Sequence, residues 1–187
     1  MSHLKAAMPR GRLLTAPAQL AGYEADGLAF KRFRPDAVAI PEDVSELVAL
    51  VKALREESTP YVIRGAGTSL SGGPVAAQGG VVIHLSRLRA IESINVEDGY
   101  AVVESGVVLD RLNDALREHG LTYPPDPSTG SVCTLGGNVA SNAGGVHCFR
   151  YGVTSNYVLG VEAILMDGRV VRFGGPAGGR GAWREDW

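Results

Sequence analysis

The stretch RGAGTSLSGG, Arg64–Gly73, places four glycines and two serines directly after an apolar segment. Successive glycines allow consecutive backbone N–H groups to point inward and bind an anion. Thr68, Ser69 and Ser71 would add hydroxyl donors to such a site. The same composition is also typical of a mobile surface loop. By itself, therefore, this stretch indicates either a phosphate-binding loop or a flexible connection.

Neither of the two familiar phosphate-binding motifs accounts for this loop. A dinucleotide-binding turn needs Gly-x-Gly-x-x-Gly leading into a helix. Here Gly65 and Gly67 are followed by four residues before Gly72, and Pro74 and a predicted strand come next. A Walker loop needs Lys and then Ser or Thr after its last glycine, and neither is present. A phosphate site in this loop would have to rely on neutral donors.

The segments on either side of the loop have regular patterns. Upstream, Ala37–Ile40 is typical of a short strand, and PEDVSELVALVKALREES (41–58) repeats apolar residues at helical spacing. Together with a strand at Tyr61–Arg64 they predict a β-α-β unit with a right-handed crossover. Downstream, the pattern predicts a strand at Val81–Leu85 and a hairpin turning at Glu97–Gly99. An amphipathic helix is predicted at 107–120, with Gly120 as its C-cap, and a short helix near Gly137–Asn142. A second hairpin is predicted to turn at Asp167–Gly168.

This order of elements predicts an α+β fold with mixed sheets and two strong helices. We expect an N-terminal arm at 1–30 with one or two helical turns, then two subdomains at about 31–95 and 96–175. The last residues, 176–187, read PAGGRGAWREDW and have neither helix nor strand periodicity, so we expect an irregular tail.

Composition excludes several classes of protein. The formal net charge of −2 argues against a nucleic-acid surface, which usually carries a basic patch. Two cysteines give no disulfide framework, and no stretch approaches the length of a membrane span. The charged N-terminus lacks the apolar segment of a signal peptide. The sequence therefore predicts a soluble cytoplasmic protein.

A second glycine- and proline-rich stretch, YPPDPSTGSVCTLGGNVASNAGG (123–145), follows the second predicted helix. Its prolines restrict the chain, while its glycines allow close approach of the backbone. Long loops within compact domains are usually functional. We expect the two glycine-rich loops to converge on one elongated ligand.

These loops, with the continuation VHCFRYG (146–152) and the upstream segment 41–67, resemble the FAD-binding domain of the FAD-linked oxidases, the vanillyl-alcohol oxidase or PCMH type. Within that family the chain most resembles the FAD-binding subunit of bacterial glycolate oxidase, with D-lactate dehydrogenases nearby. The resemblance covers roughly Tyr23 to Gly175. It implies an FAD-binding PCMH-type domain of two α+β subdomains with FAD between them.

The same resemblance implies which residues surround the cofactor. The first loop would wrap the FAD pyrophosphate, a Pro-Asp-Pro-Ser segment would lie along the flavin, and glycines and asparagines would line the ribityl and ring side. The implied cofactor-binding residues are Arg64, Gly65, Ala66, Gly67, Thr68, Ser69, Leu70, Ser71, Gly72, Gly73, Pro125, Asp126, Pro127, Ser128, Gly136, Gly137, Asn138, Asn142, Gly144, Gly145, Tyr151 and Gly152.

Some relatives attach FAD covalently through a histidine in the pyrophosphate loop. This loop has Thr68 and Ser69 and no histidine, so we expect non-covalent FAD. From the residues alone, Arg64 either pairs with a phosphate or caps its strand, and His84 is interpreted as a sheet residue. The spacing of Cys133, His147 and Cys148 matches no standard zinc pattern, so we expect no metal site.

The resemblance implies the FAD-binding portion of a flavin-dependent 2-hydroxy-acid oxidoreductase of the glycolate oxidase or D-lactate dehydrogenase type. In such enzymes hydride passes from the substrate C2 to flavin N5. The family continues into a Gly-Ser-Glu-Gly stretch and a substrate (cap) domain, which this sequence does not contain. We therefore expect a C-terminally truncated domain that is inactive alone, and no catalytic residue is assigned. The alternative is a nucleotide-binding module without turnover.

The implied partners are FAD and, in a full-length enzyme, a 2-hydroxy-acid substrate. The resemblance also allows iron–sulfur and second flavin subunits of a glycolate oxidase complex. An exposed edge of the core allows a homo-oligomer. No nucleic acid and no membrane span are expected.

Overall fold

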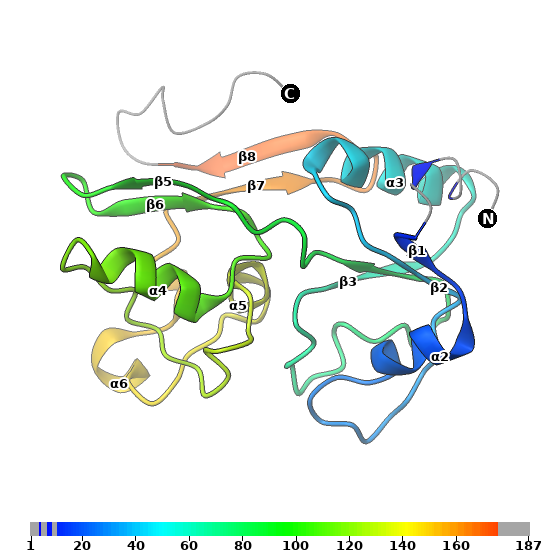
Figure 1. Ribbon diagram of the computed structural model, residues 1–187, viewed down its shortest axis with the longest axis horizontal. Coiled ribbons are helices and arrows are strands. Elements are labelled where there is room, and N and C mark those ends of the chain that lie inside the picture. The colour runs from blue at the N-terminus through cyan, green and yellow to red at the C-terminus, as the bar shows by residue number, and fades with distance from the viewer. Residues whose placement is uncertain (1–3, 5–6, 9–10, 176–187) are drawn as a thin grey trace.

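The computed structural model describes residues 4, 7–8 and 11–175, and these form two lobes side by side (Figure 1). The first lobe holds a four-stranded sheet with its helices, and the second holds a hairpin with three helices. The predicted tail at 176–187 lies outside the described residues, as does most of the first ten residues of the predicted arm. The mixed helix and strand content agrees with the predicted α+β class.

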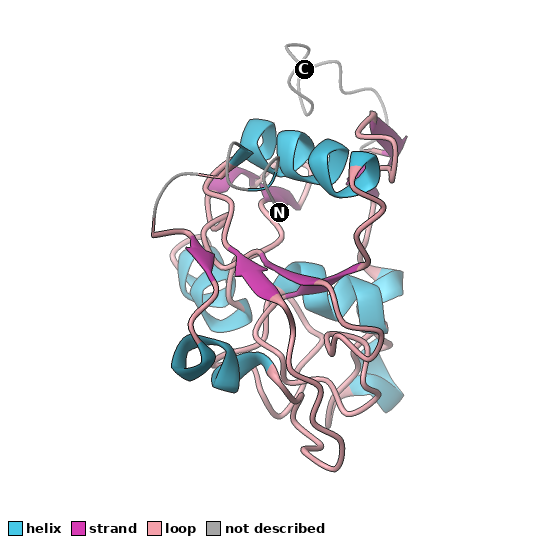
Figure 2. Cartoon of the chain, turned by 90° about the vertical axis from the view of Figure 1, so that its right-hand side faces the viewer, coloured by secondary structure: helices cyan, strands magenta, loops and turns pink. Residues whose placement is uncertain are grey.

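The sheet of the first lobe alternates its buried side chains between two faces. Helix α3 (Val44–Glu56) covers one face, where its leucines pack against Ala37, Ala39, Val81 and Ile83. The other face presents Val38 and Val82 to Leu20 of the short helix α2 (Pro17–Leu20). Figure 2 shows the two helices on opposite sides of the strands. This arrangement follows from the two-residue repeat of a strand.

The order of strands in this sheet is β1-β2-β4-β3, where β2 is Ala37–Ala39, β3 is Tyr61–Arg64 and β4 is Val81–His84. The predicted strand, helix and strand are all present. However, β2 and β3 do not pair with each other, because β4 lies between them and is parallel to both. Residues 65–80 therefore connect two adjacent parallel strands, and the glycine loop begins at the carboxyl end of β3.

The N-terminal arm contributes more to the sheet than the sequence predicted. Strand β1 (Leu13–Leu14) pairs antiparallel with β2, and a 3₁₀ turn, η1 (Ala21–Tyr23), follows α2. The expected one or two helical turns are present as α2 and η1, whereas strand β1 was not predicted. A two-residue strand carries no detectable periodicity, so only its pairing with β2 identifies it.

The second lobe begins with the predicted hairpin of β5 (Ile91–Asn95) and β6 (Tyr100–Val103), whose turn includes Gly99 at φ +68°. Helix α4 (Leu109–Arg117) buries its leucines with Cys133 and Leu135. Its C-cap residue is Glu118 rather than the predicted Gly120, which lies two residues further on at φ +70°. The Leu121 N–H closes the helix end by donating to the Leu116 carbonyl.

Three short elements and a second hairpin complete the described chain. Helix α5 (Leu135–Ser141) matches the predicted short helix, whereas α6 (Cys148–Tyr151) and the 3₁₀ turn η2 (Thr154–Asn156) were not predicted. Strands β7 (Gly160–Ile164) and β8 (Val170–Gly174) form the predicted hairpin. Ile164 packs against the core of the first lobe, so this hairpin connects the two lobes. Among the described residues, no helix is both long and apolar enough to cross a membrane.

Candidate cofactor site

The glycine loop 64–73 is supported from beneath by a buried arginine. Arg64 is only 6% exposed, its Nη1 donates to the Ala25 carbonyl at 2.8 Å, and its guanidinium lies 5.6 Å from the centre of the Tyr23 ring. Burial lowers the pKa of Arg64 from its ordinary value. Gly67, at φ +75°, lies against this guanidinium so closely that a Cβ there would overlap it. Arg64 thus holds the loop in place from inside.

The segment between β1 and β2 also fixes this loop. The Gly27 N–H donates to the Ser69 carbonyl at 2.9 Å, and the Gly72 N–H donates to Asp26 Oδ2 at 2.7 Å. Sequence reasoning missed this contact, because residues separated by more than forty positions carry no local signal of contact. The loop is therefore an ordered part of the first lobe, which argues against the flexible-connection reading.

The first half of the loop leaves its donors available. Within the described residues, no backbone N–H from Gly65 to Leu70 donates a hydrogen bond, whereas those of Ser71 and Gly72 do. Unpaired N–H groups in a bent segment attract an anion. This half of the loop has the chemistry of a phosphate cradle.

The second glycine-rich loop meets the first at Thr134. A Cβ on Gly65 would overlap Thr134 Oγ1, so the two segments are in direct contact. Thr134 is 5% exposed, and its Oγ1 accepts from the Gly137 N–H at 3.3 Å, which caps α5. The two loops therefore meet in the described structure, as their expected convergence on one ligand requires.

A cavity of about 450 Å³ lies where the loops meet. Gly65 and Ala66 of the first loop line it together with Val132 and Thr134 of the second. Residues from the second lobe complete the wall, among them Gly106, Arg89 and Arg111. Neither arginine was among the predicted site residues, because a lone exposed arginine has no distinctive sequence pattern.

Val132 and Thr134 were not predicted, and none of the second-loop residues that were predicted to bind the cofactor is in the described wall of this cavity. Gly145, at φ +150°, packs on the Asp126 carbonyl, and His147 Nδ1 is 3.2 Å from Asp126 Oδ2. These contacts join the Pro125–Ser128 segment to the start of α6. Gly144 contacts Cys148 and Val153, and Gly136 donates its N–H to the Ser105 carbonyl at 2.8 Å.

Asn142 and its neighbours support the end of α5. Asn142 ends the helix at φ +48°, and its Oδ1 accepts from the Ser155 N–H at 2.9 Å. The Tyr151 carbonyl accepts from the Tyr157 hydroxyl at 2.6 Å, and Gly152 lies against Asn156. In this structure these residues connect α5, α6 and η2.

Asn138 has an unsatisfied buried amide. The residue is only 3% exposed, and its Nδ2 has no hydrogen-bond acceptor in the part of the chain that the structure describes. An unsatisfied buried donor costs about 1 to 3 kcal/mol, so an acceptor brought by a ligand would stabilise this region. Asn138 does not line the cavity, so the fit to FAD depends on the free N–H groups of the first loop, whose chemistry suits a diphosphate.

His84 also lines the cavity, at the end of β4. Its Nδ1 lies 3.3 Å from the Arg64 carbonyl, and its ring meets Tyr23 edge-on with centroids 5.4 Å apart. Burial, opposed in part by the Arg64 carbonyl, lowers the pKa of His84 from its ordinary value of 6.5. The sequence interpretation of His84 as a sheet residue is confirmed, and the structure adds its contact with the loop.

This lowered pKa predicts a pH dependence of stability. As the pH falls below about 6.5, the unfolded chain binds a proton that folded His84 does not bind, so the free energy of unfolding decreases. Replacing His84 with Gln is expected to flatten this decrease, measured as the urea midpoint between about pH 5 and pH 8. His119→Gln, at the exposed end of α4, is the matched control. If the urea midpoint of His84→Gln falls with pH as steeply as that of the wild type, His84 is not the source of this pH dependence.

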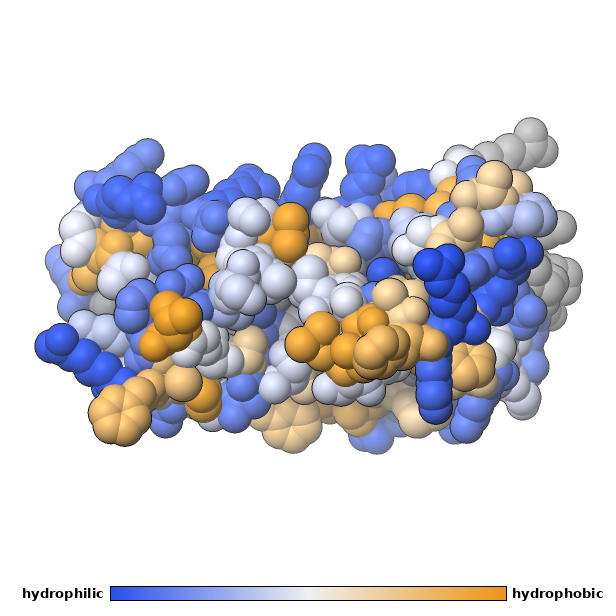
Figure 3. All heavy atoms as spheres, turned by 90° about the horizontal axis from the view of Figure 1, so that it is seen from below, coloured by the Kyte–Doolittle hydropathy of each residue, from blue (hydrophilic) through white to orange (hydrophobic). Residues whose placement is uncertain are grey.

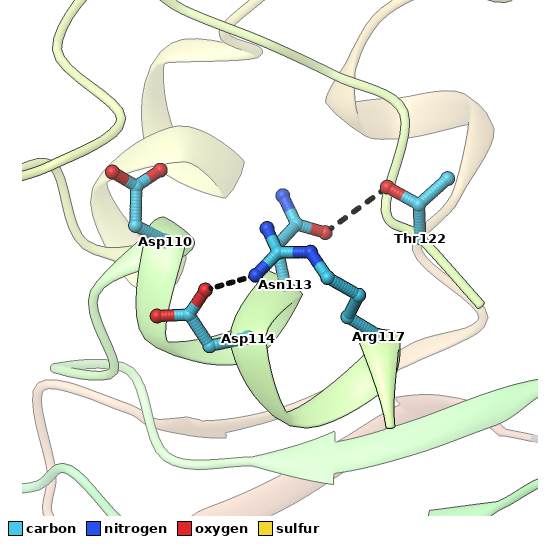
Figure 4. Close-up of a pocket in the computed structure, with 5 residues that line it drawn as sticks. All are labelled: Asp110, Asn113, Asp114, Arg117 and Thr122. Atoms are coloured by element: carbon cyan, nitrogen blue, oxygen red, sulfur yellow. Dashed lines mark hydrogen bonds and ion pairs between the residues drawn. The ribbon is translucent and has the colours of Figure 1, made fainter. Parts of the chain in front are cut away.

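A second hollow of about 290 Å³ lies on α4 and is polar (Figure 4). Here Arg117 pairs with Asp114 at 2.7 Å, and the Thr122 hydroxyl donates to Asn113 Oδ1 at 3.4 Å. These polar groups pair with one another, and the hydrogen bond between Thr122 and Asn113 joins the helix to the loop that follows it. Among the described residues, no group of three or more His, Cys, Asp or Glu side chains could hold a metal ion.

Comparison with known proteins places these observations in a family. Residues 35–174 match the family described as FAD binding domain. The chain is similar to glycolate oxidase subunit GlcD of Escherichia coli K12, with 37% identity over 174 residues, covering 93% of this chain and 35% of that protein. It is also similar to D-lactate dehydrogenase of Archaeoglobus fulgidus, with 41% identity, covering 74% and 31% of the two chains.

A third curated relative is D-2-hydroxyglutarate dehydrogenase of Xanthomonas citri pv. viticola, with 38% identity, covering 90% of this chain and 36% of that protein. The chain thus spans about a third of the length of these relatives.

Solved structures confirm the fold. p-Cresol methylhydroxylase with substrate bound has a TM-score of 0.79 at 24% identity, covering 91% of this chain and 34% of that one. Alkyldihydroxyacetonephosphate synthase has a TM-score of 0.82 at 18% identity, covering 97% and 36%.

Proposed function

The chain belongs to the FAD binding domain family, and from that premise we propose that it binds FAD non-covalently between its two glycine-rich loops. It would do so as the flavin-binding portion of a 2-hydroxy-acid oxidoreductase. The observation that carries this proposal is the contact of Gly65 with Thr134, beside a cavity that the two loops share. The free N–H groups of Gly65 to Leu70 and the unpaired amide of Asn138 support it.

Each part of the site has a distinct role in this proposal. The backbone N–H groups of the first loop would hold the diphosphate, and Asn138 would donate to a polar atom of the flavin. Thr134 would keep the loops together while it caps α5. When bound, FAD supplies a two-electron acceptor for hydride from the substrate C2. No residue of this chain is assigned to proton transfer.

The substrate class is inferred from the relatives. The names of the three curated relatives refer to glycolate, D-lactate and D-2-hydroxyglutarate, which are all 2-hydroxy acids. We extend that class to the protein of which this flavin site is part. Because the chain spans only about a third of those relatives, the second candidate is a module that binds the nucleotide without turnover.

Titration with FAD tests both candidates. We expect flavin fluorescence to be quenched on binding, and the visible flavin spectrum to shift as the ring leaves water. Acid precipitation should then release all of the flavin into the supernatant, because the loop has Thr68 and Ser69 and no histidine. Flavin remaining with the pellet would contradict non-covalent binding, and no spectral change at all would contradict the proposed function.

Reduction of an artificial dye then separates the enzyme from the module. The FAD-loaded chain is supplied in turn with glycolate, D-lactate and D-2-hydroxyglutarate. Dye reduction by any of them would favour the enzyme, whereas flavin binding without reduction would favour the module.

The proposal also covers the cellular location of the protein and its partner subunits. We propose a cytoplasmic protein, consistent with two cysteines that form no disulfide. Iron–sulfur and second flavin subunits of a glycolate oxidase complex are proposed as partners. Seen from below, the molecule exposes separate groups of hydrophobic residues (Figure 3). The most exposed large hydrophobic side chains of the described residues include Phe30, Val146 and Phe149, which supports association with another chain or copy.

A further inference from the structure

The residues that line the cavity between the two loops include positively charged but no negatively charged ones. Arg89 and Arg111 are both among the residues that line it, and no Asp or Glu is. Within the described residues, neither arginine forms an ion pair. Arg111 Nη1 donates to the backbone carbonyl of Arg89 at 2.9 Å, which holds the two residues side by side.

Two acidic side chains near this pair, Glu104 beside Ala90 and Asp110 next to Arg111, form no ion pair with it. Glu104 accepts from the Ala90 N–H at 2.6 Å, and Asp110 lines the separate hollow on α4. Two neighbouring arginines without a carboxylate partner gain stability when an anion lies within reach of both. Guanidinium groups bind phosphate oxygens with two parallel hydrogen bonds, so a phosphate is the anion that suits them best.

The same cavity also carries donors of a different kind. Gly65 and Ala66 begin the run of backbone N–H groups that donate to no described residue. The residues that line the cavity therefore combine neutral backbone donors from the first lobe with two arginines from the second. An anion of two linked phosphates could be bound by both kinds of donor.

We propose that Arg89 and Arg111 form the cationic half of a diphosphate subsite, completed by the N–H groups of the glycine loop. This inference rests on the proposed function and deepens it, because it adds two residues outside both glycine-rich loops to the recognition of the FAD diphosphate. The subsite joins the lobes through the ligand. It also makes the affinity for FAD depend on ionic strength, whereas uncharged riboflavin gains nothing from it.

Binding measurements on the full chain test this inference. Dissociation constants for FAD, riboflavin and inorganic pyrophosphate are compared among the wild type, Arg111→Gln, Arg89→Gln and the control Arg117→Gln. Arg117 shares α4 but pairs with Asp114 outside the cavity. We expect Arg111→Gln and Arg89→Gln each to weaken FAD and pyrophosphate binding roughly tenfold to hundredfold, the range for hydrogen bonds to charged groups.

Further readouts separate charge recognition from a structural effect. Riboflavin affinity should be unchanged in every variant, and the salt dependence of FAD binding should be shallower in the two cavity variants. An Arg111→Lys variant should recover part of the affinity, since it keeps the charge but loses the fork of donors. Equal weakening of riboflavin and FAD would overturn the inference, as would wild-type FAD affinity in both cavity variants.

The outcomes also distinguish this inference from the proposed function. Arginine-dependent pyrophosphate binding without FAD binding would refute the proposed function and support the subsite. FAD binding that is insensitive to both arginines would support the proposed function and refute the subsite. A wild type that binds neither ligand would refute both.

Discussion

Replacing Gly65 with alanine is expected to weaken FAD binding by tenfold or more while the fold is kept. The new Cβ would overlap Thr134 Oγ1, so the two glycine-rich loops would have to separate. Overpacking of this kind costs about 1 to 3 kcal/mol, and each 1.4 kcal/mol corresponds to a tenfold change in a dissociation constant. Titration followed by flavin fluorescence measures the effect.

A second substitution shows whether this contact is the cause. In a Thr134→Ala background, the Cβ added at position 65 would meet only the remaining Cβ of residue 134 at 3.5 Å, which is ordinary contact. The added loss from Gly65→Ala should therefore be small in that background. Gly22→Ala is the control, because nothing lies within 4 Å of a Cβ there. If the two losses simply add, the loops are not coupled through this contact.

Replacing Arg64 with alanine is expected to reduce both stability and FAD affinity. The variant loses the hydrogen bond to the Ala25 carbonyl, the contact with the Tyr23 ring and the support beneath Gly67. Relief of a buried charge offsets part of this loss, so the net cost is about 2 kcal/mol. For a chain of this size, the melting temperature should fall by roughly 4 to 8 °C.

The matched controls address charge and size. Arg87→Ala removes an arginine that is exposed and lies outside the cavity wall, and should leave the melting temperature near that of the wild type. Arg64→Lys keeps a positive charge but cannot stack as a plane on Tyr23, so it should fall between the wild type and Arg64→Ala. A wild-type melting temperature for Arg64→Ala would show that the buried arginine does not support the loop.

Local sequence patterns predicted most of the helices, strands and turns, but not which strands lie next to each other in the sheet. The helical spacing in 41–58 and the turn residues at Glu97–Gly99 and Asp167–Gly168 determine structure within a few residues, and those elements are present. The position of β4 between β2 and β3 depends on the packing of whole strands, and no short window contains that information. The same reason explains why strand β1 was missed.

The contacts of the candidate site likewise include some that the sequence predicted and others that it did not. An approach of the two glycine-rich loops was expected from their composition, and the contact of Gly65 with Thr134 agrees with it, although Thr134 itself was not predicted. The contacts of Asp26 and Gly27 with the first loop were not expected, because they join residues far apart in sequence. Arg89 and Arg111 were also missed, since their significance lies in a cavity without acidic side chains. The other predicted cofactor-binding residues stay predictions until flavin binding is measured.

The position of β4 between β2 and β3 limits the order in which the strands of this sheet can pair during synthesis of the chain. Strands β2 and β3 emerge first, yet neither has its parallel partner until residues 81–84 have been made. Pairing then draws the ends of residues 65–80 together, so the cradle for the cofactor closes as the sheet forms. The first loop can thus reach its folded shape before the second loop, residues 123–145, has been synthesised.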